Sequence, residues 1–273
     1  MTEPVAEYVR HRPPEDLRPV VAACHGYRLT GFAPGVHVGL PSPHLTVVVS
    51  LDAPLRVRKG AEDRPRHLGA LLGGLHDGPV RIDHDGTQVG IQLALTPVGC
   101  RQLLGMPAAG VAGAVVPLTS ALGPRVSELA ERAAGAMTWR ARFAVVEDVL
   151  RRALGDAGPV RPELAFAWRR LVSSRGGAGV ADLATETGWS RRHLSGQFRR
   201  EFGLAPKTVG RIARFDAAAA LLKAAPAAGV GAVAATAGYA DQAHMVRDWH
   251  NFAGAAPTAW LAAEAFPFVQ DGG

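Results

Sequence analysis

One pattern of small and apolar residues occurs twice in this chain, about fifty positions apart. The first copy places a small residue, a glycine and an aromatic residue at set intervals, and the second copy repeats these residue types. The matching positions are Leu183, Ala184, Gly188 and Trp189 in the first copy and Val233, Ala234, Gly238 and Tyr239 in the second. After one extra residue in the second copy, Leu194, Phe198, Gly203 and Pro206 match Met245, Trp249, Gly254 and Pro257. Two copies in phase, at about 180–203 and 230–254, predict that one supersecondary unit is built twice.

Each copy predicts a helix, a tight turn and a second helix. Ala184 and Ala234 are small enough to let two helices cross closely. Gly188 and Gly238 stand where a helix would end in a left-handed cap, and Ser190 can cap the next helix. This is the helix-turn-helix pattern, in which the second helix lies in the major groove of DNA.

A long amphipathic helix is expected between the two copies, from Lys207 to Ala224. Its apolar residues recur every three or four positions, and Pro226 follows its end. Eighteen residues would span about 27 Å, and one turn of DNA is about 34 Å long. A helix of that length could hold two DNA-reading units over successive major grooves on one face of the duplex.

Residues 160–262 resemble the DNA-binding domain of the AraC/XylS family of bacterial transcription regulators, through both motifs and the helix between them. The resemblance implies an all-α domain with two helix-turn-helix units at residues 160–273. It also implies that the first half senses a ligand and mediates dimerisation, often as a cupin-like barrel. Residues 155–159, Gly-Asp-Ala-Gly-Pro, are the best linker candidate, so we place the first domain at residues 1–155.

The first domain is expected to consist mainly of β-strands up to about residue 95. Residues 45–51 form a run rich in β-branched side chains between prolines, which is typical of a buried strand. Residues 79–84 and 88–95 both alternate, and Asp85-Gly86 between them predicts a hairpin turn. Helices are expected at residues 97–154. The predicted fold class is therefore α+β, with a β-rich, cupin-like barrel and trailing helices followed by an all-α double helix-turn-helix domain.

The second helix of each unit carries the residues expected to contact DNA. By the resemblance, the positions that face base edges are Arg192, Ser195 and Gly196, with Gln197 added, in the first unit and Gln242, His244 and Arg247 in the second. Gly196 departs from the family pattern, in which this position often holds a long polar side chain. The residues expected to contact phosphates are Arg191, Arg199, Arg200 and Lys207.

The two units differ in local charge. In residues 190–203, four arginines stand against Glu201, which gives a net charge of +3. In the second recognition helix, Arg247 stands against Asp241 and Asp248, which gives −1. We therefore expect the first unit to contribute more of the electrostatic affinity for DNA.

Residues 138–154 predict an amphipathic helix whose apolar stripe has two possible uses. The stripe consists of Trp139, Phe143, Val146 and Leu150, with charged residues between them. It could pack on its own barrel, or it could pair with the same helix of a second chain to form a homodimer. The resemblance favours the homodimer, because AraC-type regulators often dimerise through a helix at this position.

Histidines are scattered over the first half without an HxH or HxxxH pair, among them His25, His37, His44, His67, His76 and His84. Some of them could meet at one metal ion in a cupin-like barrel, but their scatter favours no metal, and we expect no other cofactor. Cys24 and Cys100 lack a CxxC spacing, so buried reduced thiols are favoured over a redox pair. No nucleophile elbow, phosphate-binding loop or dinucleotide fingerprint occurs, which indicates a protein that is not an enzyme.

The charge balance of the chain is basic, with a net charge of +6 that fits a nucleic-acid partner. There is no run of 18 uncharged apolar residues and no signal-peptide pattern, so we expect a cytoplasmic protein without a membrane partner. We therefore predict a sequence-specific transcription regulator that binds double-stranded DNA, responds to a small-molecule effector and contacts RNA polymerase if it is an activator. Two alternatives stay open: a ligand-independent DNA-binding scaffold, and a cupin-like metal enzyme domain fused to a DNA-binding domain.

Overall fold

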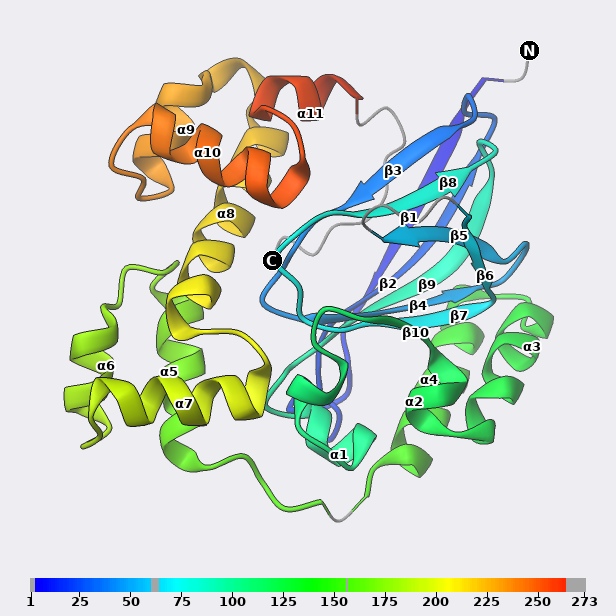
Figure 1. Cartoon of the computed structure of the whole chain (residues 1–273). Coiled ribbons are helices and arrows are strands. Elements are labelled where there is room, and N and C mark those ends of the chain that lie inside the picture. The colour runs from blue at the N-terminus through cyan, green and yellow to red at the C-terminus, as the bar shows by residue number, and fades with distance from the viewer. Residues whose placement is uncertain (1–2, 60–63, 156, 264–273) are drawn as a thin grey trace.

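Two antiparallel β-sheets form the N-terminal half, and helices make up the C-terminal half (Figure 1). The structure is a computed structural model and describes residues 3–59, 64–155 and 157–263. The larger sheet has the strand order β1 (Val5–His11), β2 (Val21–Thr30), β9 (Gln88–Leu95), β4 (Leu45–Ser50), β7 (Ala70–Gly73) and β10 (Val115–Pro117). The smaller sheet has the order β3 (Gly35–Gly39), β8 (Val80–His84), β5 (Leu55–Lys59) and β6 (Arg66–Leu68).

The two sheets stay open. Among the described residues, every paired strand has its partners within its own sheet. The predicted buried strand is β4, which lies between β9 and β7 inside the larger sheet. The predicted α+β class, a β-rich first domain followed by a helical part, is confirmed, and the β-rich domain is an open pair of sheets.

The turn at Asp85-Gly86 connects the two sheets. β8 pairs with β3 and β5 in the smaller sheet, whereas β9 pairs with β2 and β4 in the larger one. Gly86 has a φ of +93°, and a Cβ there would collide with the carbonyl oxygen of Phe32, so glycine is required. The hairpin prediction was wrong because turn residues specify a sharp reversal but do not specify which strand each arm pairs with.

The helices predicted in residues 97–154 are present. They are α1 (Cys100–Leu104), α2 (Leu118–Leu122), α3 (Ser127–Gly135) and α4 (Trp139–Ala153), with the short turns η1 (Ala108–Val111) and η2 (Pro124–Val126). In Figure 1, α3 and α4 lie side by side beneath the larger sheet. The side chain of Thr138 caps α4 by accepting a hydrogen bond from the backbone nitrogen of Ala141.

The apolar stripe of α4 packs on its own domain. Phe143, Val146 and Leu150 are 2%, 2% and 4% exposed within the single chain. Phe143 also stacks on His11 of β1, with ring centroids 4.4 Å apart. These three side chains therefore pack on their own domain, which is one of the two possibilities that the sequence left open. The expected use of these three in a homodimer does not fit their burial.

The C-terminal half consists of two helix-turn-helix units joined by a long helix. Its elements are α5 (Pro162–Ser173), α6 (Val180–Glu186), α7 (Arg191–Phe202), α8 (Pro206–Ala224), η3 (Pro226–Ala228), α9 (Val230–Thr236), α10 (Gln242–Ala253) and α11 (Pro257–Ala263). Gly188 and Gly238 have φ values of +70° and +80°, as the predicted left-handed caps require. In Figure 1, α8 runs between the two units, with α7 near one end and α10 near the other.

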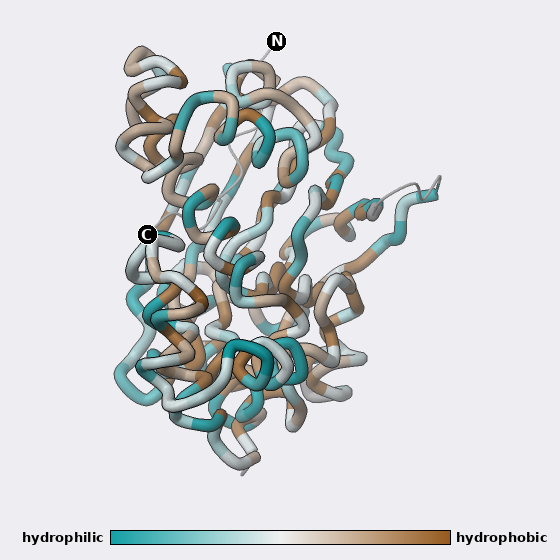
Figure 2. Tube along the Cα trace, turned by 60° about the vertical axis from the view of Figure 1, so that its left-hand side comes forward, coloured by the Kyte–Doolittle hydropathy of each residue, from teal (hydrophilic) through white to brown (hydrophobic). Residues whose placement is uncertain are grey.

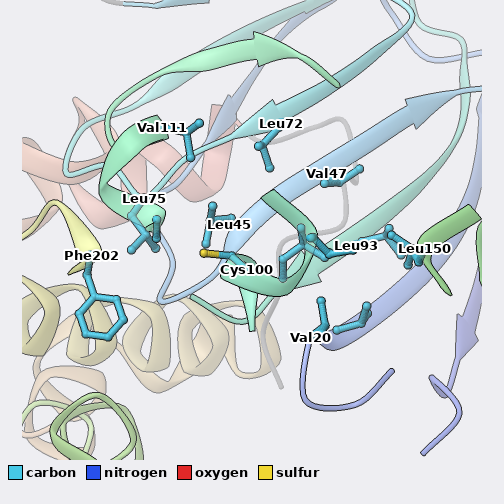
Figure 3. Packing of buried hydrophobic residues seen from close by; sticks show 14 of the residues in the cluster. Val20, Leu45, Val47, Leu72, Leu75, Leu93, Cys100, Val111, Leu150 and Phe202 are labelled. Carbon is cyan, nitrogen blue, oxygen red and sulfur yellow. The ribbon is translucent and has the colours of Figure 1, made fainter. Parts of the chain in front are cut away.

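The first unit shares its hydrophobic core with the N-terminal domain. One cluster of buried residues contains side chains of the N-terminal domain, such as Leu75, together with side chains of the first unit, such as Phe202. Figure 3 shows Phe202 of α7 on the same side of this cluster as Leu75 and Val111. The second unit has a separate cluster around Trp249, against which Leu40 of the N-terminal domain packs.

Hydrophilic and hydrophobic positions alternate along the helices (Figure 2), as expected when each helix buries one face. Among the described helices, none has the length and apolar composition needed to span a membrane.

Candidate DNA-binding surface and ligand cavity

Helix α7 carries four exposed arginines, Arg191, Arg192, Arg199 and Arg200, and its outward face holds the last three of them. The opposite face is mainly apolar and buried. An open depression on the outward side is lined by Ser190, Arg192, His193, Ser195, Gly196, Gln197, Arg199 and Arg200. The structure thus brings together all predicted base-contact positions of the first unit and two of its predicted phosphate contacts. Lys207, a further predicted phosphate contact, is exposed in the first turn of α8.

The acidic residue of α7, Glu201, is turned inward. Its side chain is 6% exposed and accepts two hydrogen bonds from Arg101 of α1, Nε to Oε1 and Nη2 to Oε2, each 2.7 Å long. This pairing raises the pKa of the Arg101 guanidinium above its ordinary value. Because Glu201 is turned inward and paired with Arg101, no carboxylate of α7 lies beside the arginines on the outward face.

The outward face of α10 holds fewer cations. Gln242 and Arg247 are exposed, and His244 is half-buried with its ring edge-on to Tyr239, the centroids being 5.1 Å apart. His250 and Asn251 are also exposed, one turn beyond Arg247. Sequence reasoning missed these two, although overlaying the repeats at the offset of 51 places them on the first unit's Arg199 and Arg200.

Of the two acids counted in the second unit, Asp248 is turned inward. Asp248 has a side chain that is 3% exposed and accepts hydrogen bonds from Arg211 of α8 at 3.0 and 2.6 Å. Asp241 caps α10 by accepting a hydrogen bond of 2.6 Å from the backbone nitrogen of His244. The local charge of −1 therefore does not describe the charge that the surface of the second unit presents to DNA, because Asp248 is buried and paired.

The N-terminal domain holds the inner side of α7 closely. Besides the bond from Arg101 to Glu201, Gly203 at the end of α7 has a φ of +80°, and a Cβ there would collide with the methyl group of Ala112. Phe202 joins the shared core. The first recognition helix is thus attached to the N-terminal domain by an ion pair, a close backbone approach and apolar packing.

A cavity of about 80 Å³ lies between the inner faces of the two sheets. Its walls are largely apolar, with side chains that include Val48, Leu71 and Val115 from the larger sheet and Val57, Val80 and Ile82 from the smaller. Its polar side chains are His37, Ser42, Thr46, His76, Gln92 and Asp216. Asp216 belongs to α8, so the helix that joins the two helix-turn-helix units also forms part of the cavity wall.

The histidines of the first half do not gather at one point. In the part of the chain that the structure describes, no three His, Cys, Asp or Glu side chains lie close enough to hold a metal ion. Burial lowers the pKa of His44 to about 4 and also lowers the pKa of His25. The thiols of Cys24 and Cys100 are buried and form no disulfide, and burial raises the pKa of Cys100 to about 12.

Comparison with known proteins agrees with this geometry. The family model described as a helix-turn-helix domain matches residues 183–263. These residues form an AraC-type helix-turn-helix domain. With this domain the chain is a DNA-binding regulator, as the sequence predicts. No curated protein matches the chain in sequence.

Solved structures of ToxT from Vibrio cholerae share the two-part architecture. One crystal structure is 12% identical, with a TM-score of 0.51, over 88% of this chain and 97% of that chain. Another, of wild-type ToxT bound to an unsaturated fatty acid, is 11% identical with a TM-score of 0.51, over 99% of this chain and all of that one. At this level of identity the likeness shows the fold, a β-rich N-terminal domain followed by a helical one.

Proposed function

We propose that this protein is a sequence-specific transcription regulator that binds double-stranded DNA through α7 and α10 and responds to a small molecule bound in its N-terminal domain. The single observation that carries the proposal is the outward face of α7. It presents Arg192, Arg199 and Arg200, while the acid of the same helix is turned inward and paired. Such a face suits the phosphates and the guanine edges of a major groove.

The length of α8 supports the use of both units at once. Its 19 residues give a rod of about 28 Å, against about 34 Å for one turn of DNA. The ion pair of Arg211 with Asp248 ties this rod to α10. Two recognition helices at the ends of such a rod would meet successive major grooves on one side of the duplex.

The proposed contacts follow from exposure and reach. In the first unit, Arg192, Ser195 and Gln197 are proposed to meet base edges. Gly196 has no side chain to contribute, and a Cβ there would meet no atom within 4 Å, so the gap is open. The proposed phosphate contacts are Arg191, Arg199, Arg200 and Lys207, and the second unit would add Gln242, His244 and Arg247.

A ligand-responsive N-terminal domain is supported by the cavity between the sheets. The cavity has largely apolar walls with a few polar groups, as small-molecule sites usually have. One ToxT neighbour of the same fold is a complex with an unsaturated fatty acid. Because Asp216 of α8 lines the cavity, a ligand there would contact the connecting helix directly. This favours a ligand-responsive regulator over a ligand-independent scaffold.

Partners beyond DNA and the small molecule belong to the proposal as well. Contact with RNA polymerase is proposed if the protein is an activator. A homodimer would need a surface other than Phe143, Val146 and Leu150, which are buried in the chain's own core. We propose no catalytic activity.

The test is a selection of genomic fragments with the purified full-length protein, followed by binding measurements on the selected site. Arg199→Ala/Arg200→Ala should bind this site much more weakly than wild type. The matched control is Arg10→Ala/Arg12→Ala, which removes two exposed arginines near β1, far along the chain from α7. Selection of no preferred sequence, or equal losses in both double variants, would contradict the proposal.

A further inference from the structure

We infer that His193 of α7 and His244 of α10 make equivalent contacts to DNA phosphates, one in each helix-turn-helix unit, and that Trp189 and Tyr239 position them. This inference rests on the proposed function, since it assumes that α7 and α10 meet the DNA. It adds a contact residue to the first unit, and it gives His244 a phosphate in place of a base edge.

The same arrangement of a histidine and an aromatic ring occurs in both units. The imidazole of His193 stands edge-on to the ring of Trp189, with centroids 4.7 Å apart and 86° between the planes. The imidazole of His244 stands edge-on to the ring of Tyr239, at 5.1 Å and 90°. The overlay of the sequence repeats, at offsets of 50 and 51, places Trp189 on Tyr239 and His193 on His244. The two pairs therefore occupy equivalent places in the repeated unit.

Each of the two aromatic rings also packs against an arginine. The guanidinium of Arg161, directly before α5, lies 4.7 Å from the centroid of the Trp189 ring. The guanidinium of Arg214, in α8, lies 5.4 Å from the centroid of the Tyr239 ring. A cation over a ring face is attracted by the π-electrons and restricts the orientation of the ring. Each histidine therefore rests on a ring that is held from a second side.

Helix caps fix the backbone of both histidines. The side chain of Ser190 accepts a hydrogen bond of 3.1 Å from the backbone nitrogen of His193. The side chain of Asp241 accepts one of 2.6 Å from the backbone nitrogen of His244. A side chain that is held at its backbone and at its ring loses little conformational entropy when it binds, so both imidazoles are organised for a contact before DNA arrives.

His193 lies on the face of α7 that is proposed to meet DNA. It is exposed and lines the same depression as Arg192, Gly196 and Arg200. Seven residues separate His193 from Arg200, which places them about 20° apart around the helix axis, on one flank of this face. The flanks of a helix in the major groove face the two phosphate strands, and an imidazole N–H is a suitable donor to a phosphate oxygen.

The two histidines would dock both units on DNA in the same way while the units read different bases. The overlay that matches His193 with His244 also matches Gly196 of the first unit with Arg247 of the second. The side chains at the centre of the two outward faces therefore differ, whereas the histidine is shared. Phosphate contacts fix the register and orientation of a protein on DNA and carry no sequence information directly.

The test measures binding of the full-length protein to the selected DNA site and to random DNA at about pH 8, where an imidazole is ordinarily neutral. His193→Ala should weaken binding to both DNAs by about tenfold, as expected for a lost hydrogen bond to a charged acceptor. The salt slope should stay unchanged, because a neutral donor replaces no counterion. His244→Ala should act in the same way on a site that engages both units.

Two further variants separate the donor from the shape of the side chain. His193→Gln keeps a side-chain N–H donor and should bind within about threefold of wild type. The matched control is His67→Ala, which removes an exposed histidine of β6 in the N-terminal domain and should bind as wild type does.

The positioning role of Trp189 is tested by a double-mutant cycle. In the Trp189→Leu background, His193→Ala should weaken binding by less than about threefold, because the imidazole has already lost the ring that holds it. In the Trp189→Phe background, which keeps a ring, the loss should stay close to about tenfold. The same loss in the Leu and Phe backgrounds would refute the positioning role.

Wild-type affinity of His193→Ala would overturn the inference, and so would a loss on the selected site alone, because His193 would then contact a base. Equal weakening by the Ala and Gln variants, or an effect of His193→Ala with none of His244→Ala, would overturn it as well. Melting temperatures show whether each variant folds, and His244→Ala with His244→Gln carries the test if His193→Ala does not. Loss of binding in Arg199→Ala/Arg200→Ala without a loss in His193→Ala refutes this inference alone, whereas selection of no preferred sequence by wild type refutes the proposed function.

Discussion

Replacing Arg101 by methionine should destabilise the attachment of the N-terminal domain to α7. The substitution keeps a long apolar side chain but removes both donors to Glu201, which sit 2.7 Å from its oxygens. The Glu201 side chain is 6% exposed, so solvent has little access to the carboxylate once its partner is gone.

The expected magnitude follows from the burial of the two partners. Removing one partner of a buried ion pair costs about 3–5 kcal/mol, because the other charge stays buried and uncompensated. The Arg101 side chain is 30% exposed, so water screens the pair and we expect about 2–3 kcal/mol for Arg101→Met. The double variant Arg101→Met/Glu201→Gln should lose less than about 1 kcal/mol, because no charge is left behind.

The measurement is urea unfolding of wild type, both single variants and the double variant, which forms a double-mutant cycle. Tryptophan fluorescence is a suitable signal, since Trp168 lies 4.5 Å from the ring of Phe202 in the shared core. The control is Arg132→Met, which breaks an ion pair with Asp148 whose side chains are 40% and 41% exposed. That change should cost less than about 0.5 kcal/mol.

Two results would refute this reasoning. If Arg101→Met and the double variant lose the same free energy, the loss comes from packing and the charge pair contributes nothing of its own. If Arg101→Met unfolds at the wild-type urea concentration, Glu201 is accessible to water in solution and the N-terminal domain does not hold α7 as the structure shows.

The remaining predictions concern three individual side chains and one pair of arginines. Arg192→Ala should cost about 1–3 kcal/mol on a specific site and relax the base preference at one position in competition assays; equal weakening on random DNA would make it a phosphate contact. Arg199→Ala/Arg200→Ala should lower the salt slope of binding by about 0.9 per lost phosphate contact, and an unchanged slope would make them plain surface charges. Gly196→Ala should raise stability to urea by about 0.5–1 kcal/mol because a Cβ there meets no atom within 4 Å; a loss would contradict that open space. Burial lowers the pKa of His44 from 6.5 to about 4, so between pH 6.5 and 4 the His44 imidazole is protonated in the unfolded chain but neutral in the folded one. The free energy of unfolding should therefore fall by up to about 3 kcal/mol as the pH drops through that range. His44→Gln should remove this part of the pH dependence of the urea midpoint, and an unchanged pH slope would show that His44 is not its source.

Local signals in the sequence were sufficient for the helical half. The helix expected at Lys207–Ala224 is α8, Pro206–Ala224, because its period and the proline after it depend only on neighbouring residues. Ser190 caps α7 as predicted, accepting a hydrogen bond from the backbone nitrogen of His193 at 3.1 Å. The exposure of the predicted DNA-contact positions on α7 follows from the same period.

Pairings over long distances in the chain could not be predicted. Arg101 and Glu201 are 100 residues apart, and no local pattern marks them as partners. Asp248 was counted in the local charge of the second recognition helix, but it is buried and paired with Arg211, which lies 37 residues earlier in the chain. Asp216 sits in a regular helical pattern, so its place in the cavity of another domain was not visible in the sequence. The strand pairing predicted around Asp85-Gly86 was wrong for the same reason, because the partners of β8 and β9 lie far away in the chain.

The two helix-turn-helix units are attached to the N-terminal domain in different ways, and this asymmetry bears on how a ligand could act. The first unit shares a continuous core with that domain and is held by Arg101. The second unit has its own core, touched by Leu40, and is carried by α8. A ligand beside Asp216 would contact α8 between the two, where a small tilt would displace α10 more than α7. On this argument an effector would change the spacing and orientation of the two recognition helices, so its effect should be larger on DNA that engages both units than on a half-site that engages only α7.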